Sequence, residues 1–171
     1  MSTLYCTQDL LERLTTVDAT PGASSDNRLG AWTATIVPLA PVRMLLAVSD
    51  HARLPLALAA MPYEDLLSRL PEALYQLLLD IKFPADLARL ERDAMQPLQP
   101  VAAGDRTSVA LLQDYAVELR RVWEQGLSRS PAELSLHLAT QATEHLEGAT
   151  PAQAARRRFQ LLPDQTEALG L

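Results

Sequence analysis

The stretch Ala31–Val37, AWTATIV, decides the fold class of this chain. Apolar residues occupy every second position from Trp32, and threonines occupy the positions between them from Thr33. This alternation is the period of a half-buried strand. Two further apolar runs follow, Met44–Val48 (MLLAV) and Leu54–Leu58 (LPLAL). Because only short connections separate the three runs, they predict an antiparallel meander.

Segments on either side of this meander complete the sheet and its loops. Thr3–Cys6 (TLYC) predicts a short opening strand, and 96–101 (QPLQPV) predicts an edge strand because its two prolines exclude it from a central position. Pro, Gly, Ser, Asp and Asn accumulate over 17–28, which predicts a flexible loop. Residues 164–171 are expected to form a loose C-terminal tail.

Helical periodicity dominates the chain beyond the third apolar run. Leucines at helical spacing precede and follow Pro71, which predicts that a new helix begins at this proline. The longest helix is predicted over 107–125, and Ser130 and Thr150 each open a capping-box pattern that predicts another helix. The sequence therefore predicts one α+β domain over 1–171. In it, a small antiparallel sheet of three to five strands, mostly N-terminal, packs against five to six helices, mostly C-terminal.

Composition excludes several classes of protein. The 171 residues include 15 Lys and Arg against 21 Asp and Glu, a net charge of −6 at pH 7 with His neutral. This acidic balance favours solubility and weighs against general binding to nucleic-acid phosphates. No apolar run approaches the ~20 residues that span a bilayer, and the N-terminus lacks the pattern of a secretory signal. We expect a soluble cytoplasmic protein that does not contact a membrane.

The helix predicted over 131–146 carries the first candidate site. Glu133, His137 and Glu144 fall on its polar face, with His145 at the edge of that face. Glu and His at positions i and i+4 can hold a divalent metal ion. The alternative is an ordinary solvated face with Glu–His pairing, and the HExxH arrangement of zinc proteases is absent.

The start of the longest predicted helix carries the second candidate site. Asp105, Arg106 and Ser108 lie where the free backbone N–H groups of a helix start can bind an anion, and Arg106 adds a positive charge. The alternative is a plain N-cap at Asp105 or Thr107, which needs no ligand.

Arg156, Arg157 and Arg158 form a basic run in the last predicted helix. Such a run can bind a phosphate backbone or an acidic partner. An aromatic content of 5% leaves few residues on which bases could stack, so we favour a solvated outer face of the helix.

Signatures of nucleophilic or cofactor chemistry are absent from the sequence. Cys6 is the single cysteine, so no intramolecular disulfide can form, and no local motif marks it as a nucleophile with a base such as His51. There is no Walker loop, no GxGxxG and no GxSxG. The sequence therefore predicts no cofactor.

Short motifs follow one another over most of the chain: Tyr5–Thr7 (YCT) and two leucines, Arg28–Trp32 (RLGAW), Arg43–Val48 (RMLLAV), and 105–108 (DRTS) with Asp114. In this combination the chain resembles a bacterial family of uncharacterised domains, a domain of unknown function. The resemblance implies a shared fold and no known reaction.

Together these features predict a non-catalytic interaction or accessory domain that binds another protein or a second copy of itself. Polar residues are accounted for by helix and turn formation, and surface complementarity is then the means of recognition. The alternative is a small enzyme or an anion- or nucleotide-binding protein with its site at 105–108. Nucleic-acid binding through 156–158, helped by Arg120 or Arg121, is the third possibility.

Overall fold

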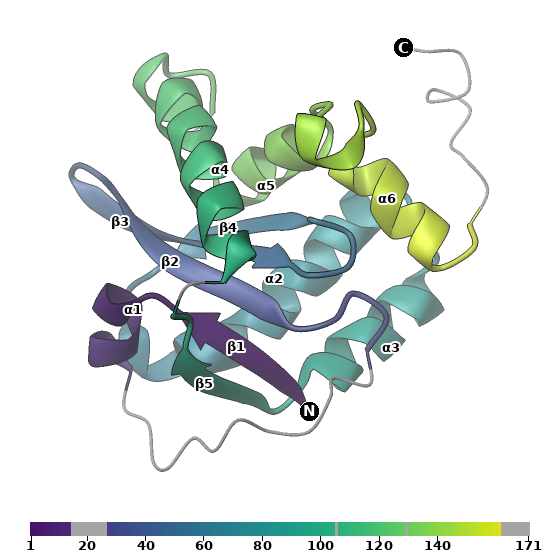
Figure 1. Ribbon diagram of the computed structural model, residues 1–171, viewed down its shortest axis with the longest axis horizontal. Helices are drawn as coiled ribbons and strands as arrows, with labels where there is room; N and C mark the ends of the chain where they lie inside the picture. The colour runs from purple at the N-terminus through teal and green to yellow at the C-terminus, as the bar shows by residue number, and fades with distance from the viewer. Residues whose placement is uncertain (15–26, 105, 129, 162–171) are drawn as a thin grey trace.

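The computed structural model describes residues 1–14, 27–104, 106–128 and 130–161. Its strands form one five-stranded sheet in the order β4-β3-β2-β1-β5 (Figure 1). The strands are β1 (Ser2–Cys6), β2 (Trp32–Leu39), β3 (Val42–Ser49), β4 (Pro55–Ala59) and β5 (Leu98–Ala102). The predicted α+β class, with a mostly N-terminal sheet and mostly C-terminal helices, is confirmed.

The antiparallel meander predicted from the three apolar runs is present as β2, β3 and β4. Residues opposite one another run from Trp32 with Ser49 to Leu39 with Val42, so a two-residue turn closes the β2–β3 hairpin. β3 and β4 are also antiparallel.

The expectation of a wholly antiparallel sheet is wrong at β1, which pairs parallel with both β2 and β5. Residues 7–31 connect β1 to β2, and a connection of this length can return the chain to the end of the sheet where β1 began. β5 lies at the edge of the sheet, where its proline Pro100 is tolerated, as predicted.

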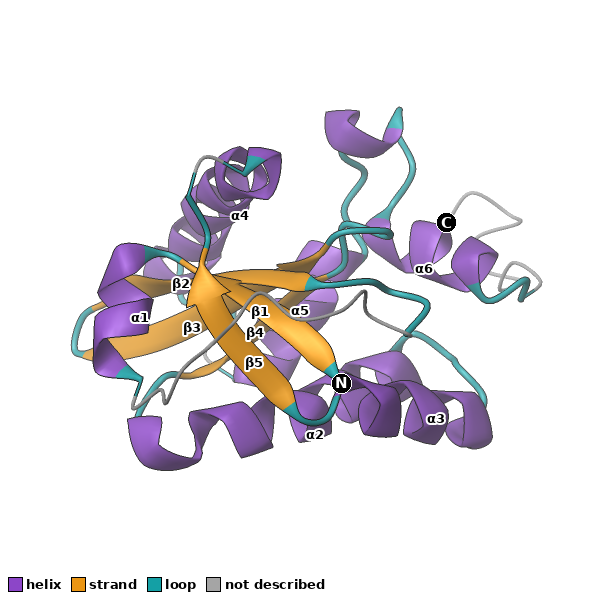
Figure 2. Ribbon diagram, turned by 60° about the horizontal axis from the view of Figure 1, so that its bottom comes forward, coloured by secondary structure: helices purple, strands orange, loops and turns teal. Residues whose placement is uncertain are grey.

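Helices cover both faces of the sheet. They are α1 (Gln8–Arg13), α2 (Leu66–Asp80), α3 (Ala85–Met95), α4 (Thr107–Glu124), α5 (Pro131–Ala139) and α6 (Pro151–Arg158), with the short 3-10 turns η1 (Tyr63–Asp65) and η2 (Glu144–Leu146). Figure 2 shows α4 on one side of the sheet and α2 and α3 on the other.

β2 is buried on both faces, whereas its alternation predicts a half-buried strand. Trp32 and Ile36 belong to the core that includes leucines of α2, whereas Val37 belongs to the core formed with α4 and α5. A strand that is buried on both faces needs a helical layer over each of them. α4 packs on β2 and β3, which places its charged outer flanks beside the β3–β4 turn and α5.

Two predicted helix starts differ from the structure. Pro71 lies inside α2, because buried leucines on both sides of it, Leu70 and Leu74, continue one apolar stripe into the core. Thr150 forms the predicted capping box with Gln153, but the side chain of Ser130 makes no cap hydrogen bond.

Glu133 explains the missing capping box at Ser130. Its Oε2 accepts a hydrogen bond of 2.7 Å from the hydroxyl of Ser128, so this carboxylate is turned toward Ser128. A capping box requires the glutamate to reach back to the backbone N–H of the N-cap residue instead.

Residues 17–26 of the loop predicted over 17–28, and the tail predicted over 164–171, lie outside the described residues, whereas Asn27 and Arg28 are held by hydrogen bonds. The buried carboxylate of Glu91 accepts hydrogen bonds from the backbone N–H groups of Arg28 and Leu29. The Asn27 amide donates to the carbonyl of Gly30 and accepts from Ser2. These bonds fix the approach to β2.

Within the described ranges, no helix combines the length and the apolar character needed to cross a membrane.

Candidate functional site

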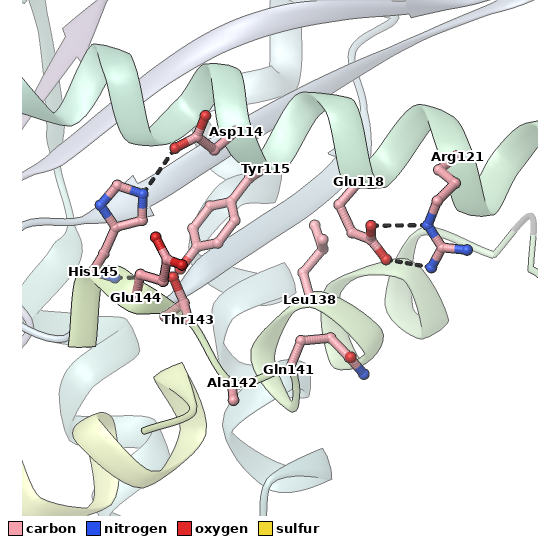
Figure 3. Close-up of a pocket in the computed structure, with 10 residues that line it drawn as sticks. All are labelled: Asp114, Tyr115, Glu118, Arg121, Leu138, Gln141, Ala142, Thr143, Glu144 and His145. Carbon is pink, nitrogen blue, oxygen red and sulfur yellow. Dashed lines mark hydrogen bonds and ion pairs between the residues drawn. The ribbon is translucent and has the colours of Figure 1, made fainter. Parts of the chain in front are cut away.

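A cleft of about 520 Å³ lies between α4 and the segment that connects α5 to η2. Figure 3 shows side chains from both elements converging on it. Its lining residues are Asp114, Tyr115, Glu118, Arg121, Leu138, Gln141, Ala142, Thr143, Glu144 and His145. This volume lies within the range of small-ligand pockets.

α4 supplies one wall of the cleft. Asp114, Glu118 and Arg121 lie three or four residues apart, so they project from the same flank of the helix. Tyr115 is mostly buried, and its hydroxyl donates a 2.8 Å hydrogen bond to the carbonyl of Arg53 at the β3–β4 turn. The flank is therefore fixed against the sheet by Tyr115 while its charged groups face the cleft.

The segment after α5 supplies the other wall. α5 ends at Ala139, and the hydroxyl of Thr140 donates back to the carbonyl of Leu136. Thr143 then caps η2 by accepting a hydrogen bond from the backbone N–H of His145. This cap orients Glu144 and His145 beside α4 (Figure 3).

A histidine–carboxylate pair joins the two walls. His145 Nε2 lies 2.8 Å from Asp114 Oδ2, and the His145 side chain is 41% exposed. A second pair joins α4 to α5, because His137 Nε2 lies 3.0 Å from Glu118 Oε1. Both pairs gain an ionic component when the imidazole is protonated.

Glu118 is the most strongly held carboxylate of the cleft. Its two oxygens accept hydrogen bonds of 2.5 and 2.9 Å from the Arg121 guanidinium. Arg121 first, and His137 second, hold the pKa of Glu118 at about 2, below its ordinary value of 4.5. Glu118 therefore stays ionised at any physiological pH.

The charged lining is predominantly negative. Asp114, Glu118 and Glu144 contribute three carboxylates against the single guanidinium of Arg121 and the titratable imidazole of His145. Glu144 is exposed and makes no side-chain hydrogen bond or ion pair with the described residues. The arrangement suits a positively charged group rather than an anion.

The lining hydroxyls are both engaged in structural hydrogen bonds. Tyr115 donates to a carbonyl, and burial raises the pKa of its phenol well above the ordinary value. The hydroxyl of Thr143 accepts from a backbone N–H. Neither hydroxyl is hydrogen-bonded to the imidazole of His145. A hydroxyl that acts as a nucleophile would need such a bond to a general base.

The structure does not assemble the predicted metal ligands. Glu133 and His137 lie on α5, whereas Glu144 lies in η2, because the helix ends at Ala139 and does not continue to 146. Glu133 accepts from Ser128, and His137 pairs with Glu118. Within the described ranges, no group of three or more His, Cys, Asp or Glu side chains is placed to hold a metal ion.

The predicted anion-binding residues meet a carboxylate of the same chain. Asp105 lies outside the described residues. Arg106 Nη2 donates a 2.6 Å hydrogen bond to Asp50 Oδ2, and its guanidinium lies 3.6 Å from the centroid of the Tyr5 ring. Ser108 donates to the other oxygen of Asp50 and accepts from Arg53. An anion at this helix start would have to compete with Asp50 for Arg106.

Two of the three arginines of the basic run bind backbone carbonyls. Arg156 donates to the carbonyls of Ile81 and Lys82 at the C-terminal end of α2, where a positive charge is favourable. Arg158 donates to the carbonyl of Arg28, and Arg157 is exposed. These bonds give the run a structural role, and its binding to nucleic acid remains a prediction.

Cys6 is 1% exposed and donates a hydrogen bond to the carbonyl of Leu4. Burial raises the pKa of its thiol to about 12. Because the thiolate is the nucleophile, this cysteine is a core residue.

The family model described as Domain of unknown function (DUF6933) matches residues 3–154. The chain belongs to this family. The expected membership of a family of domains of unknown function is therefore confirmed. No curated protein and no solved structure matches the chain. The DUF6933 match includes every residue that lines the cleft and ends before Arg156.

The sequence pointed to individual cleft residues without placing them in one site. Asp114 is one of the residues that carry the sequence resemblance, and Glu144 and His145 lie on the predicted metal-binding face. Arg121 is a predicted helper of the basic run, and no sequence pattern points to Glu118. Their common flank on α4 is visible from the i, i+4 and i, i+3 spacing. The opposing wall is not, because it depends on where α5 ends.

Proposed function

We propose that this DUF6933 domain is a non-catalytic binding domain, and that its cleft receives a positively charged side chain of a partner protein. One observation carries the proposal: three carboxylates and one guanidinium line a cleft of about 520 Å³. The Glu118–Arg121 pair is internally neutral, and one oxygen of Asp114 is bonded to His145. The other oxygen of Asp114 and the carboxylate of Glu144 remain to attract a cation.

The apolar part of the lining supports a lysine or arginine side chain as the group that binds. Leu138, Ala142 and the ring of Tyr115 lie between the charged groups. Long basic side chains pack their methylene stems on such surfaces while the charged head reaches a carboxylate or water. Gln141 adds a side-chain amide, whose oxygen can accept from a guanidinium or ammonium group.

The expected affinity for a single basic residue is modest. Asp114 and Glu144 are exposed, and ion pairs between exposed groups contribute about 0.2–1 kcal/mol each. Useful affinity therefore requires a partner segment with several contacts, and it should fall as salt is added.

One observation favours a second candidate function. Asp114 holds His145 in the manner of a carboxylate that orients a general base, which would allow His145 to activate a water molecule on a bound substrate. This candidate predicts ester or amide hydrolysis that both His145→Gln and Asp114→Asn slow. The engaged hydroxyls of Tyr115 and Thr143 make binding the better-supported function.

Fluorescence anisotropy with two labelled peptides, GKGKGKG and GEGEGEG, tests the proposal. We expect the lysine peptide to bind more tightly than the glutamate peptide. We expect the double variant Asp114→Asn/Glu144→Gln to weaken lysine-peptide binding about two- to thirtyfold, the sum of two exposed ion pairs. The matched control, Glu64→Gln/Asp86→Asn, removes the same charge from exposed positions outside the cleft. Absence of lysine-peptide binding, or equal losses in the two double variants, would contradict the proposal.

A further inference from the structure

The second half of β2 lacks a neighbouring strand on the side that faces β1. β1 pairs only with Trp32–Ala34, at the start of β2. The N–H of Thr7 then bonds the carbonyl of Ala34, and the chain enters α1. On this side the ladder stops, although β2 continues to Leu39.

The hydrogen-bond alternation identifies the backbone groups that are left on this edge. The carbonyl of Ala34 points away from β3, because it accepts from Thr7. Groups alternate along an antiparallel pair, so those of Ile36 and Pro38 point the same way. Because proline has no N–H, the groups on this edge are the N–H of Ile36 and the carbonyls of Ile36 and Pro38. No hydrogen bond from the described residues reaches them.

The outer edge of β4 is treated differently. The Ser135 hydroxyl both donates to the carbonyl and accepts from the N–H of Ala57, and Arg69 donates to the carbonyl of Ala59. Covering edge groups in this way prevents pairing with other chains. α1 contacts β2, but no hydrogen bond from the described residues reaches the edge groups of Ile36 and Pro38.

A groove of about 240 Å³ runs beside the open edge of β2, between that edge and α4. Its walls include Thr35, Val37 and Val109. Val117 also lines it and is 65% exposed, so its side chain is accessible to a partner. Arg120 supplies the charged group of the groove lining. Its side chain is exposed and makes no hydrogen bond or ion pair with the described residues.

We propose that this groove binds an extended segment of a partner protein that carries a carboxylate side chain, and that the segment adds to β2 as a strand. The free groups of Ile36 and Pro38 supply main-chain pairing, and Val117 supplies an apolar contact. The unpaired guanidinium of Arg120 selects a carboxylate. A second copy of this chain would instead bring a second Arg120 to the same edge, which repulsion disfavours.

This surface lies on the opposite flank of α4 from the cleft, so the inference does not depend on the proposed function. Val117 and Arg120 face the groove, whereas Asp114 and Glu118 face the cleft. A variant of one surface should leave binding at the other unchanged.

The test uses the labelled peptides TVEVTV and TVKVTV with the full chain. We expect the glutamate peptide to bind at least about tenfold tighter than the lysine peptide, and Arg120→Glu to reverse this preference. Arg157→Glu, the same charge change at an exposed position on α6, should leave it unaltered. N-methylation of one alternating set of peptide amides should abolish binding, and methylation of the other set should not.

Three results would overturn the proposal. The first is failure of both peptides to bind at about 1 mM, where only interactions weaker than roughly 4 kcal/mol escape detection. The second is a failure of the backbone or charge test: either both N-methylated peptides still bind, or Arg120→Glu leaves the preference for the glutamate peptide over the lysine peptide unchanged. The third is a wild-type dimer in sedimentation that the glutamate peptide dissociates, which would assign the edge to a second copy.

Discussion

Replacing Glu118 by glutamine tests the electrostatics of the cleft. The variant loses the ionic part of the bonds to Arg121 and His137. A fall in pKa from 4.5 to about 2 corresponds to roughly 3 kcal/mol, and solvent screening of a side chain that is 32% exposed reduces this to about 1–2 kcal/mol. We expect urea unfolding at pH 7 to show a free energy of unfolding that is lower by this amount. In thermal unfolding, Tm should fall by about 2–8 °C.

The pH dependence of the Glu118→Gln effect gives a sharper result than its size. The folded-state pKa is lowered, so the stabilisation is fully present above about pH 4.5 and is lost as the pH falls toward 2. The difference between wild type and variant should therefore shrink over this range. Glu64→Gln, at an exposed carboxylate, should change stability by less than about 0.5 kcal/mol. A difference that stays constant from pH 7 to pH 3 would refute the assigned cause.

Three further predictions concern the scaffold. Gly30 has φ +80°, and an added Cβ would lie 2.7 Å from His51 Nε2, so Gly30→Ala should lower the free energy of unfolding in urea by about 1–3 kcal/mol. The additional change His51→Ala should recover only the part due to the steric clash, because the backbone strain at φ +80° remains. Ser135→Ala should cost about 1–3 kcal/mol because it leaves both backbone groups of Ala57 unpaired; wild-type stability would show that water replaces the hydroxyl. With a thiol pKa of about 12, Cys6 should react with iodoacetamide at pH 8 only upon unfolding, and rapid labelling of the folded protein would contradict its burial.

Local patterns predicted the elements whose residues interact with near neighbours in sequence. The alternation from Trp32 to Ile36 gave the strand β2, although not the burial of both its faces, and the capping box at Thr150 gave the start of α6. The longest helix, predicted over 107–125, is observed as Thr107–Glu124. Each of these depends on spacing within a few residues, which the sequence records directly.

The features that the sequence did not reveal depend on contacts between distant residues. The parallel pairing of β1 is decided by the course of the chain over residues 7–31, which apolar periodicity does not encode. Arg106 forms its ion pair with Asp50, which lies 56 positions away in the sequence. The helical period alone favours a helix to 146, whereas the helix ends at Ala139.

The candidate cleft shows the same division. Asp114 and Glu118 could be placed on one flank of a helix from their spacing. His145 meets Asp114 across 31 residues only because α5 ends early and η2 turns toward α4. The sequence therefore supplied the residue types of the site and one of its walls, and the structure supplied the second wall.

The most direct measurement is a titration of ¹⁵N-labelled protein with GKGKGKG, followed through backbone amide chemical shifts. The proposed binding of a basic segment predicts saturable shifts at Asp114, Glu118, Thr143 and His145, with none at the β2 edge. The titration should flatten in Asp114→Asn/Glu144→Gln. Shifts spread over the acidic surface without saturation, or centred on a different face, would contradict the assignment of this cleft as the binding site.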